Sequence, residues 1–321
     1  MNDPAAFVRQ AVERLRSQVP ERAIVAASGG IDSTVAARLA ELALGDRARC
    51  LFVDTGLLRE GEVDRVRSYF RESGTHVEVV NAPDLFLGAL EGVTDPEEKR
   101  RRIGHAFIRL FEREAARIPT DRLIQGTIAP DWIESGSTAG GDAAKRDTIK
   151  THHNVGGVPK DTTLTLVEPL RDLYKDEVRA VAKELKIADP HRQPFPGPGL
   201  AVRVVGEVTA ERVRRARVAN RIVEEEVERA VAAKELARPW QYFAVLLPLR
   251  TVGVLGDNRF HGEAVSVRIV ESIDAMTARS VALPHALGAR IAEQITRELA
   301  GEVVRVLYDL SDKPPATIEW E

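Results

Sequence analysis

Residues 28–34 read Ser28-Gly29-Gly30-Ile31-Asp32-Ser33-Thr34, between an apolar run at 23–27 and a helix-like run at 35–40. The sequence therefore predicts a buried strand, a glycine-rich loop and a helix N-terminus in succession. In such an arrangement backbone N–H groups and the positive end of the helix dipole face one point. The two glycines allow a close backbone approach, and the hydroxyl side chains add donors. We expect this loop to bind an anion such as a phosphate.

The loop contains neither the Gly-x4-Gly-Lys-Ser/Thr motif nor the Gly-x-Gly-x-x-Gly motif. Its Ser-Gly-Gly-x-Asp-Ser pattern resembles the PP-loop of ATP pyrophosphatases. That resemblance implies an enzyme that cleaves ATP between the α- and β-phosphates and leaves AMP on a substrate oxygen. The alternative is a glycine-rich turn that binds nothing.

The rest of the first half alternates between strand and helix patterns. We expect strands at 23–27, 49–54, 77–80 and 123–127. We expect helices at 5–19, from the end of the loop to about 44, at 60–73, at 96–117 and at 174–186. This alternation predicts an α/β fold with a parallel, doubly wound sheet. Asp54-Thr55-Gly56 and Gln125-Gly126-Thr127 end two of the strands, at the edge where such sheets bind ligands.

A loop-rich region at 131–162 follows, and it is interpreted as a functional lid or as a disordered segment. Asp131 and Glu134 could carry Mg²⁺ or orient a purine, with ordinary turn residues as the alternative. Lys150 and Lys160 could stabilise a departing pyrophosphate, with two solvated lysines as the alternative.

The clearest boundary is the proline-rich stretch at 190–199, which cannot form a helix. We place the ATP pyrophosphatase domain at 1–194 and a smaller α/β domain at 195–321. In the second domain we expect helices at 209–236 and 286–299 and strands at 242–247, 264–270 and 303–308. The tail at 312–321 combines two prolines, a tryptophan, a cation and an anion, which suggests a docked, ligand-touching tail rather than a flexible one.

The overall composition is balanced. The 321 residues contain 46 Lys plus Arg and 49 Asp plus Glu, so nothing points to a nucleic-acid or membrane partner. No apolar run reaches membrane-spanning length and no signal-peptide pattern is present, so we expect a cytoplasmic protein. The single cysteine, Cys50, excludes an intrachain disulfide and a multi-cysteine metal site.

Seven segments together resemble the synthetase part of the GMP synthase family. They are 28–33, Phe52 to Arg59, Gln125-Gly126-Thr127-Ile128, Lys150 to Gly157, Pro194 to Leu200, Val252 to Asp257, and Lys313 to Glu321. The segments run in order over nearly the whole chain. The first is shared with many ATP pyrophosphatases, whereas the proline-rich segment and the tail are far more specific.

This resemblance implies that ATP adenylylates XMP on its C2 oxygen and that ammonia then displaces AMP to give GMP. Asp32, Lys150 and Lys160 would be catalytic, and Asp32 would contact Mg²⁺, mainly through phosphates. The ATP-binding residues would be Ser28, Gly29, Gly30, Ile31, Asp32, Ser33, Thr34, Asp54, Thr55 and Gly126. The XMP-binding residues would be Arg305, Lys313, Ile318 and Glu319, near the interface of a homodimer formed by the C-terminal domain.

The chain also departs from the family pattern. Gln193 stands where the family usually has histidine, and the turn after Gly256 continues as Phe260-His261-Gly262-Glu263 instead of the usual aromatic-bearing turn. Cys50 lacks the Gly-x-Cys-x-Gly setting of a glutaminase nucleophile, and only about 27 residues precede the loop. We therefore expect a synthetase subunit that takes ammonia from a separate glutaminase subunit.

Two alternatives stay open. The chain could be another ATP pyrophosphatase, which amidates or thiolates a different substrate such as a NAD precursor or a tRNA. It could also be a non-catalytic nucleotide-binding subunit, which would bind ATP and XMP and release no pyrophosphate.

Overall fold

The computed structural model describes residues 3–129, 161–188, 193–273 and 275–321. By its internal contacts the chain divides into two compact units. Unit 1 comprises Met1–Gly56, Gly61–Ala89 and Arg100–His191, and unit 2 comprises Leu57–Glu60, Leu90–Lys99 and Arg192–Glu321.

Unit 1 contains a sheet of five parallel strands in the order β3-β2-β1-β4-β5 among the described residues. The strands are β1 (Ala23–Ala27), β2 (Ala48–Asp54), β3 (Glu78–Asn81), β4 (Arg122–Ile124) and β5 (Thr165–Val167). The predicted parallel, doubly wound α/β sheet is thus confirmed. The sequence patterns did not reveal β5, because a strand of three residues is too short to establish an alternation.

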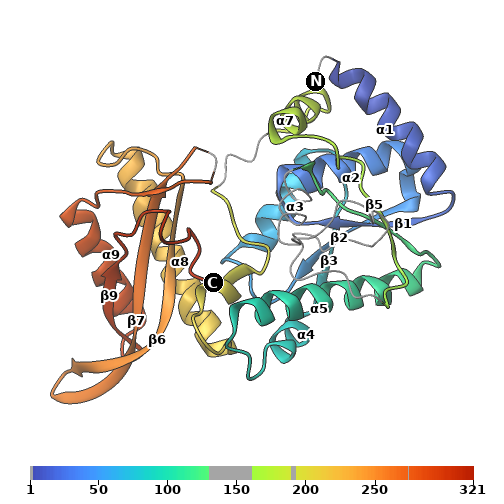
Figure 1. Cartoon of the computed structure of the whole chain (residues 1–321). Helices are drawn as coiled ribbons and strands as arrows, with labels where there is room; N and C mark the ends of the chain where they lie inside the picture. Colours follow the sequence, from blue (N-terminus) through green and yellow to red (C-terminus); the bar gives the residue numbers. More distant parts are fainter. Residues whose placement is uncertain (1–2, 130–160, 189–192, 274) are drawn as a thin grey trace. The chain divides into compact units, whose positions relative to one another are not determined.

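Helices cover both faces of this sheet: α1, α2 and α7 lie on one face, and α4 and α5 lie on the other (Figure 1). The helices of unit 1 are α1 (Pro4–Gln18), α2 (Ile31–Leu44), α3 (Glu62–Glu72), α4 (Pro83–Ala89), α5 (Pro96–Arg117, whose first residues belong to unit 2) and α7 (Lys175–Glu184), with a 3-10 turn η1 at Gly45–Arg47. In the described part of the chain, no helix is both long and apolar enough to cross a membrane.

The strand order places a topological switch point at β1. From β1 the chain first proceeds to β2 on one side, and it later returns to β4 on the other side. The connections diverge at the carboxyl end of β1, which leaves a crevice there, the usual ligand position in open α/β sheets. The loop at 28–30 leaves β1 at this point, so the fold itself directs attention to it.

Unit 2 is built on a second, mixed sheet. Its strands are β6 (Gln241–Leu255), β7 (Asn258–Glu271), β8 (Arg279–Ser280) and β9 (Val303–Tyr308). β7 pairs antiparallel with β6 and β8 and parallel with β9. The helices α8 (Ala210–Ala232) and α9 (His285–Glu298) pack against β6 and β9, respectively, and a 3-10 turn η2 spans Gly199–Arg203. This smaller α/β unit follows the parallel sheet, as expected.

The β6–β7 hairpin is longer than the sequence patterns predict. The expected strands at 242–247 and 264–270 each extend toward a two-residue turn between Leu255 and Asn258. The pairing register shifts between Leu247 and Arg250, where Pro248 lacks an N–H for the ladder. That irregularity breaks the alternation of apolar residues and concealed the outer half of the hairpin.

Candidate active site

The loop after β1 has a backbone that only glycine can adopt without strain. Gly29 has a φ of +79°, and a Cβ atom there would lie 2.6 Å from Cγ2 of Val66 on α3. Gly30 is the N-cap residue of α2 and has an extended conformation. The two glycines thus bring the chain from strand to helix within three residues and leave the loop backbone uncovered by side chains.

Hydroxyl groups hold this loop in place. Ser33 Oγ accepts from Ser28 N at 3.1 Å and from Ser28 Oγ at 3.0 Å, and it donates to Gly30 O at 3.0 Å. Thr34 Oγ1 also donates to Gly30 O, at 2.9 Å. The N–H groups of the first turn of α2 have no acceptor within the helix and point toward the sheet edge. Donors at a helix N-terminus can hold an anion, so residues 28–34 form a candidate anion cradle.

Asp32 lies in the first turn of α2, and its two carboxylate oxygens have different surroundings. Oδ2 pairs with Nζ of Lys175, the first residue of α7, at 2.6 Å. Oδ1 is buried and has no hydrogen-bond partner among the described residues. A buried carboxylate oxygen without a donor is costly unless a cation or a donor reaches it. This oxygen is therefore the natural point for a cation to join the cradle.

The neighbouring strand ends complete the sheet edge. A Cβ atom on Gly126, just after β4, would lie 2.8 Å from Ser33 N and 2.9 Å from the carbonyl carbon of Asp32. β4 ends at Ile124, earlier than expected, since Gly126 passes directly against the α2 N-terminus. After β2, Asp54 Oδ1 accepts from Gly56 N at 2.9 Å, and Thr55 is buried. Asp54, Thr55 and Gly126 thus lie at the edge that the sequence predicted.

Residues 131–160 of the predicted loop-rich region lie outside the described residues, and four candidate site residues lie among them. These four are Asp131, Glu134, Lys150 and Lys160. The roles suggested for them stay predictions.

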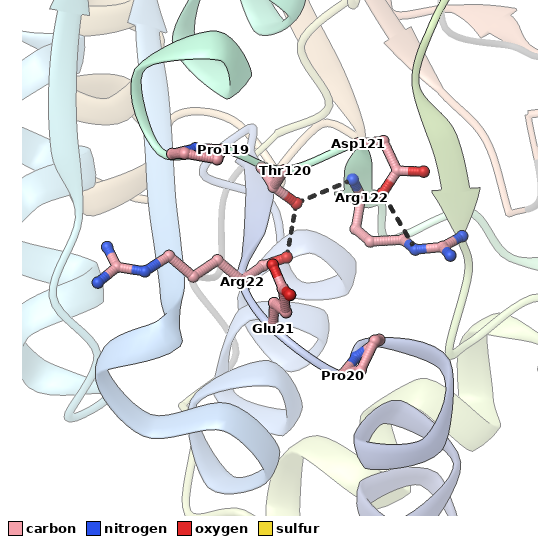
Figure 2. Close-up of a pocket in the computed structure, with 7 residues that line it drawn as sticks. All are labelled: Pro20, Glu21, Arg22, Pro119, Thr120, Asp121 and Arg122. Carbon is pink, nitrogen blue, oxygen red and sulfur yellow. Dashed lines mark hydrogen bonds and ion pairs between the residues drawn. The ribbon is translucent and has the colours of Figure 1, made fainter.

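Two hollows in the described part of unit 1 have defined linings. One, of about 310 Å³, is lined by residues 20–22 and 119–122, at the amino ends of β1 and β4 (Figure 2). It therefore lies at the edge of the sheet opposite the cradle, and its Arg22 and Arg122 side chains point apart. The other, of about 380 Å³, is lined by Ile31 of α2, by part of α7 and by residues just after α7, and its basic residues are Arg179, Lys183 and Lys186. Of these two hollows, the second adjoins the cradle through Ile31.

In unit 2 the C-terminal tail is docked, as one of the two predicted alternatives had it. Ile318 is 8% exposed and packs in a cluster with Phe243, Val245, Val270 and Ala278. The Glu319 carboxylate accepts from Nη2 of Arg203 at 2.8 Å, from its Nε at 3.1 Å and from Nε2 of Gln241 at 2.9 Å. These donors hold the carboxylate in one orientation.

The other two residues predicted to bind a nucleotide are less enclosed. Lys313 pairs through its backbone with Ala278, and its Nζ donates to Ala275 O at 2.9 Å. Arg305 lies on β9 beside Ala264, and its Nε donates to Thr251 Oγ1 at 3.2 Å. The structure thus brings Lys313, Ile318 and Glu319 together in the tail, whereas Arg305 lies farther along the sheet.

Sequence reasoning missed three residues that contact the predicted site residues. Lys175 pairs with Asp32, and Arg203 and Gln241 bind Glu319. Arg203 lies just after the proline-rich motif, and its position beside a family-specific motif could have marked it as a site residue. Lys175 and Gln241 lie 143 and 78 residues from their partners, and no local pattern marks them.

Gln193, which replaces the usual histidine, has a structural role. Its Nε2 donates to Glu224 Oε1 at 3.1 Å, and its Oε1 accepts from Tyr242 N at 2.8 Å. The side chain therefore joins the start of β6 to α8 within unit 2. A neutral amide offers both a donor and an acceptor at fixed positions, which suits these two partners.

Comparison with known proteins gives consistent matches. A family model described as GMP synthase C terminal domain matches residues 225–320. Over its whole length the chain is similar to proteins that are named as one subunit of glutamine-hydrolyzing GMP synthase. It is 53% identical to the one from Thermoplasma acidophilum (99% of each chain), 55% identical to that from Pyrococcus horikoshii (99% and 100%) and 52% identical to that from Methanocaldococcus jannaschii (100% of each).

Proposed function

The chain belongs to the family of these GMP synthase subunits, and we propose that it makes GMP from XMP, ATP and ammonia. It is a ligase that works in GMP biosynthesis. In the proposed reaction the C2 oxygen of XMP attacks the α-phosphorus of ATP and pyrophosphate leaves. Ammonia then attacks C2 and AMP leaves with the former C2 oxygen. The observation that carries this proposal is the cradle at 28–34, which offers donors for a polyphosphate at the switch point of the sheet.

We assign the polyphosphate of ATP to the loop and first turn of α2. The backbone N–H groups meet phosphate oxygens. Gly29 and Gly126 let the loop pack closely against α3 and let β4 approach the α2 N-terminus, where a Cβ atom would clash. Asp54 and Thr55, on the neighbouring strand end, are assigned to the nucleoside part. Lys150 and Lys160 are assigned to the departing pyrophosphate, where positive charge stabilises the transition state.

Mg²⁺ fits this site through Asp32. Among the described residues no group of three or more His, Cys, Asp or Glu side chains could hold a metal ion. A hard cation would therefore take the buried Oδ1 of Asp32 together with phosphate oxygens, which is the usual coordination of Mg²⁺ with a nucleotide. The ion would neutralise the charge that develops on the pyrophosphate. Lys175 keeps the other Asp32 oxygen charge-paired and so limits how the carboxylate can rotate.

We assign XMP to the tail of unit 2. Lys313 and Arg305 can pair with a nucleotide phosphate. Glu319 keeps acceptor capacity beyond its three bound donors and can accept a purine N–H, while Ile318 lends apolar surface next to it. This division places the two nucleotides on different elements, the loop of unit 1 and the tail of unit 2.

Two kinds of partner complete the proposal. The relatives are named as one subunit of their enzyme, which implies a further subunit, and we infer that it is a glutaminase that supplies ammonia. We also infer a homodimer through unit 2. The outer half of the β6–β7 hairpin exposes Leu249, Val252, Val254 and Leu255 by 49–70%, an apolar surface that suits a second copy.

Pyrophosphate release by the purified chain tests the function. The chain is incubated with Mg-ATP and ammonium, with and without XMP, and with glutamine in place of ammonium. We expect release that depends on XMP, with GMP formed from ammonium and none from glutamine. Release independent of XMP would leave an ATP pyrophosphatase with another substrate. Nucleotide binding without release would identify a non-catalytic subunit.

A further inference from the structure

Arg268 on β7 binds the C-terminal segment from within the core of unit 2. Its side chain is 0% exposed. Nε donates to Ile318 O at 2.9 Å, Nη2 to Thr317 O at 2.9 Å, and Nη1 to Ser311 O at 2.9 Å and to Asp309 Oδ2 at 2.8 Å. All four acceptors belong to residues 309–318, so one guanidinium joins both ends of this segment.

A buried charge is an expensive way to hold a segment of chain. An apolar anchor of similar volume would cost less, because a guanidinium loses its hydration when it is buried. The planar fork of arginine, however, fixes several acceptors in one geometry, which an apolar contact does not. Three of the four acceptors are backbone carbonyls, so Arg268 sets the path of the backbone between Asp309 and Ile318.

A second buried cation holds the end of the same tail. Lys99 is 0% exposed, and its Nζ donates to Val204 O at 2.8 Å and to the Glu321 carboxylate. Glu321 Oε1 also accepts from Gly206 N at 3.1 Å. Between the two anchors the indole of Trp320 donates to Asp309 Oδ2 at 3.0 Å. Trp320 thus connects the end of the tail to Asp309, so the tail is taken from here on as residues 309–321.

The residues assigned to XMP lie within this segment. Lys313 lies between the Ser311 and Thr317 carbonyls that Arg268 binds, and Glu319 lies between Ile318 and Glu321. A terminal segment without such anchors would fray, and ordering it costs about 1–2 kcal/mol per residue. If XMP had to order the tail, that cost would be subtracted from its binding free energy.

We propose that Arg268 is a positioning residue for the nucleotide site: it holds residues 309–319 in the binding-competent form before substrate arrives, and Lys99 secures the end. This rests on the proposed function, because the ligand of the tail is taken to be XMP. Arg268 acts through the tail rather than by touching substrate, because its side chain is fully buried and four of its five N–H donors bind tail residues. Its effect is on the fraction of molecules in which Lys313 and Glu319 are in place.

The test uses Arg268→Lys in the full chain. Lysine keeps the charge but cannot serve the four acceptors as a fork. Apparent affinity falls in proportion to the competent fraction, so a tail that is ordered in about a tenth of the molecules raises the KM for XMP about tenfold. We expect that rise, an unchanged KM for ATP and a kcat that recovers at saturating XMP. Without ligand, amides of 311–321 should exchange with deuterium faster, while those of β6 and β7 should not.

A second variant tests the proposal independently in case Arg268→Lys does not fold, and a third serves as the control. Lys99→Met combined with Glu321→Gln removes the second anchor without leaving an unpaired buried charge, and we expect the same pattern with a smaller rise in KM. Arg290→Lys disturbs an ion pair with the fully buried Glu226, in the same unit but away from the tail. It should change neither the KM for XMP nor the exchange of the tail amides.

The outcomes separate the two proposals. If the unchanged protein makes GMP but Arg268→Lys leaves both the XMP KM and the exchange of 311–321 as they were, Arg268 has no positioning role. Equal losses for XMP and ATP in a folded Arg268→Lys protein would also overturn it, because they indicate a general structural defect. If the unchanged protein does not use XMP, the proposed function fails, and the exchange experiment still decides whether Arg268 orders the tail.

Discussion

The loop at 28–34 and the tail at 309–321 are both polar segments assigned to nucleotides, yet they are held in opposite ways. The loop is fixed by short hydroxyl contacts within itself and by glycines that fit against α3 and the α2 N-terminus. It leaves one carboxylate oxygen of Asp32 buried without a donor among the described residues. The tail is fixed by buried cations from distant parts of unit 2, and its carboxylates are surrounded by donors.

This difference matches the two tasks that we assign. A site for a polyphosphate and its metal ion needs unsatisfied donors and an unsatisfied anion, because the ligand brings the complementary groups. A site that recognises a purine base needs fixed groups whose geometry does not depend on the ligand. Four perturbations test this comparison, from the largest expected effect to the smallest.

Replacing Asp32 by alanine should affect the loop most severely. Asp32→Ala removes the unpartnered oxygen and the partner of Lys175. We expect pyrophosphate release to fall by at least about 100-fold, the order typical for loss of one group that stabilises transition-state charge. Circular dichroism and the melting temperature should stay close to those of the unchanged protein. Turnover at the original rate would remove Asp32 from the catalytic site.

Deleting residues 313–321 should remove the XMP site and also lower the stability of unit 2, because Arg203, Arg268 and Lys99 are buried and lose acceptors in the tail. The deletion removes Lys313, Ile318 and Glu319, so XMP binding should weaken far more than ATP binding. Isothermal titration of the two nucleotides measures this directly. Equal losses for both nucleotides, or no loss for either, would count against the tail as the XMP site.

Adding one methyl group at Gly126 should disturb the loop without changing any charge. In Gly126→Ala the new Cβ meets Ser33 N at 2.8 Å, so the α2 N-terminus has to shift. A displacement of about 1 Å at a catalytic site can cost about 100-fold in rate, and overpacking costs about 1–3 kcal/mol in stability. Pyrophosphate release and thermal unfolding measure the two effects.

Gly88→Ala is the matched control for that substitution. Gly88 lies within α4, and a Cβ atom there meets nothing within 4 Å. The change should raise stability by about 0.5–1 kcal/mol and leave the rate unchanged. If both alanine variants behaved alike, close approach at Gly126 would not be the cause.

The smallest effect concerns acid stability in unit 1. The hydrogen bond from Arg49 lowers the pKa of Glu78 below its ordinary value, an effect that burial partly opposes. A carboxyl group whose pKa is lower in the folded state stabilises the folded protein at pH values above its unfolded-state pKa. This stabilisation is lost as the pH falls through the folded-state pKa. Arg49→Met should therefore move the midpoint of acid unfolding to higher pH. An unchanged midpoint would show that this half-exposed pair contributes nothing measurable.

The sequence predicted the loop more fully than the tail, for a physical reason. The strand, the glycine-rich turn and the helix at 23–44 interact mostly within about twenty residues, so their pattern is visible locally. The positions of Asp54 and Gly126 followed from the parallel alternation of strands. In contrast, the partners of the tail are distant in the sequence: 41 to 116 residues separate Arg268, Arg203 and Gln241 from the tail residues that they bind. Nothing in their own segments marks them as partners of the tail.

In the proposed reaction ATP activates the C2 oxygen of XMP, and the fate of that oxygen tests this step most directly. The chain is supplied with Mg-ATP, ammonium and XMP labelled with oxygen-18 at C2, and the products are separated and analysed by mass spectrometry. We predict that AMP carries the label, because the labelled oxygen bonds to the α-phosphorus and leaves with it. Label found in pyrophosphate or in inorganic phosphate, with none in AMP, would contradict adenylylation of XMP.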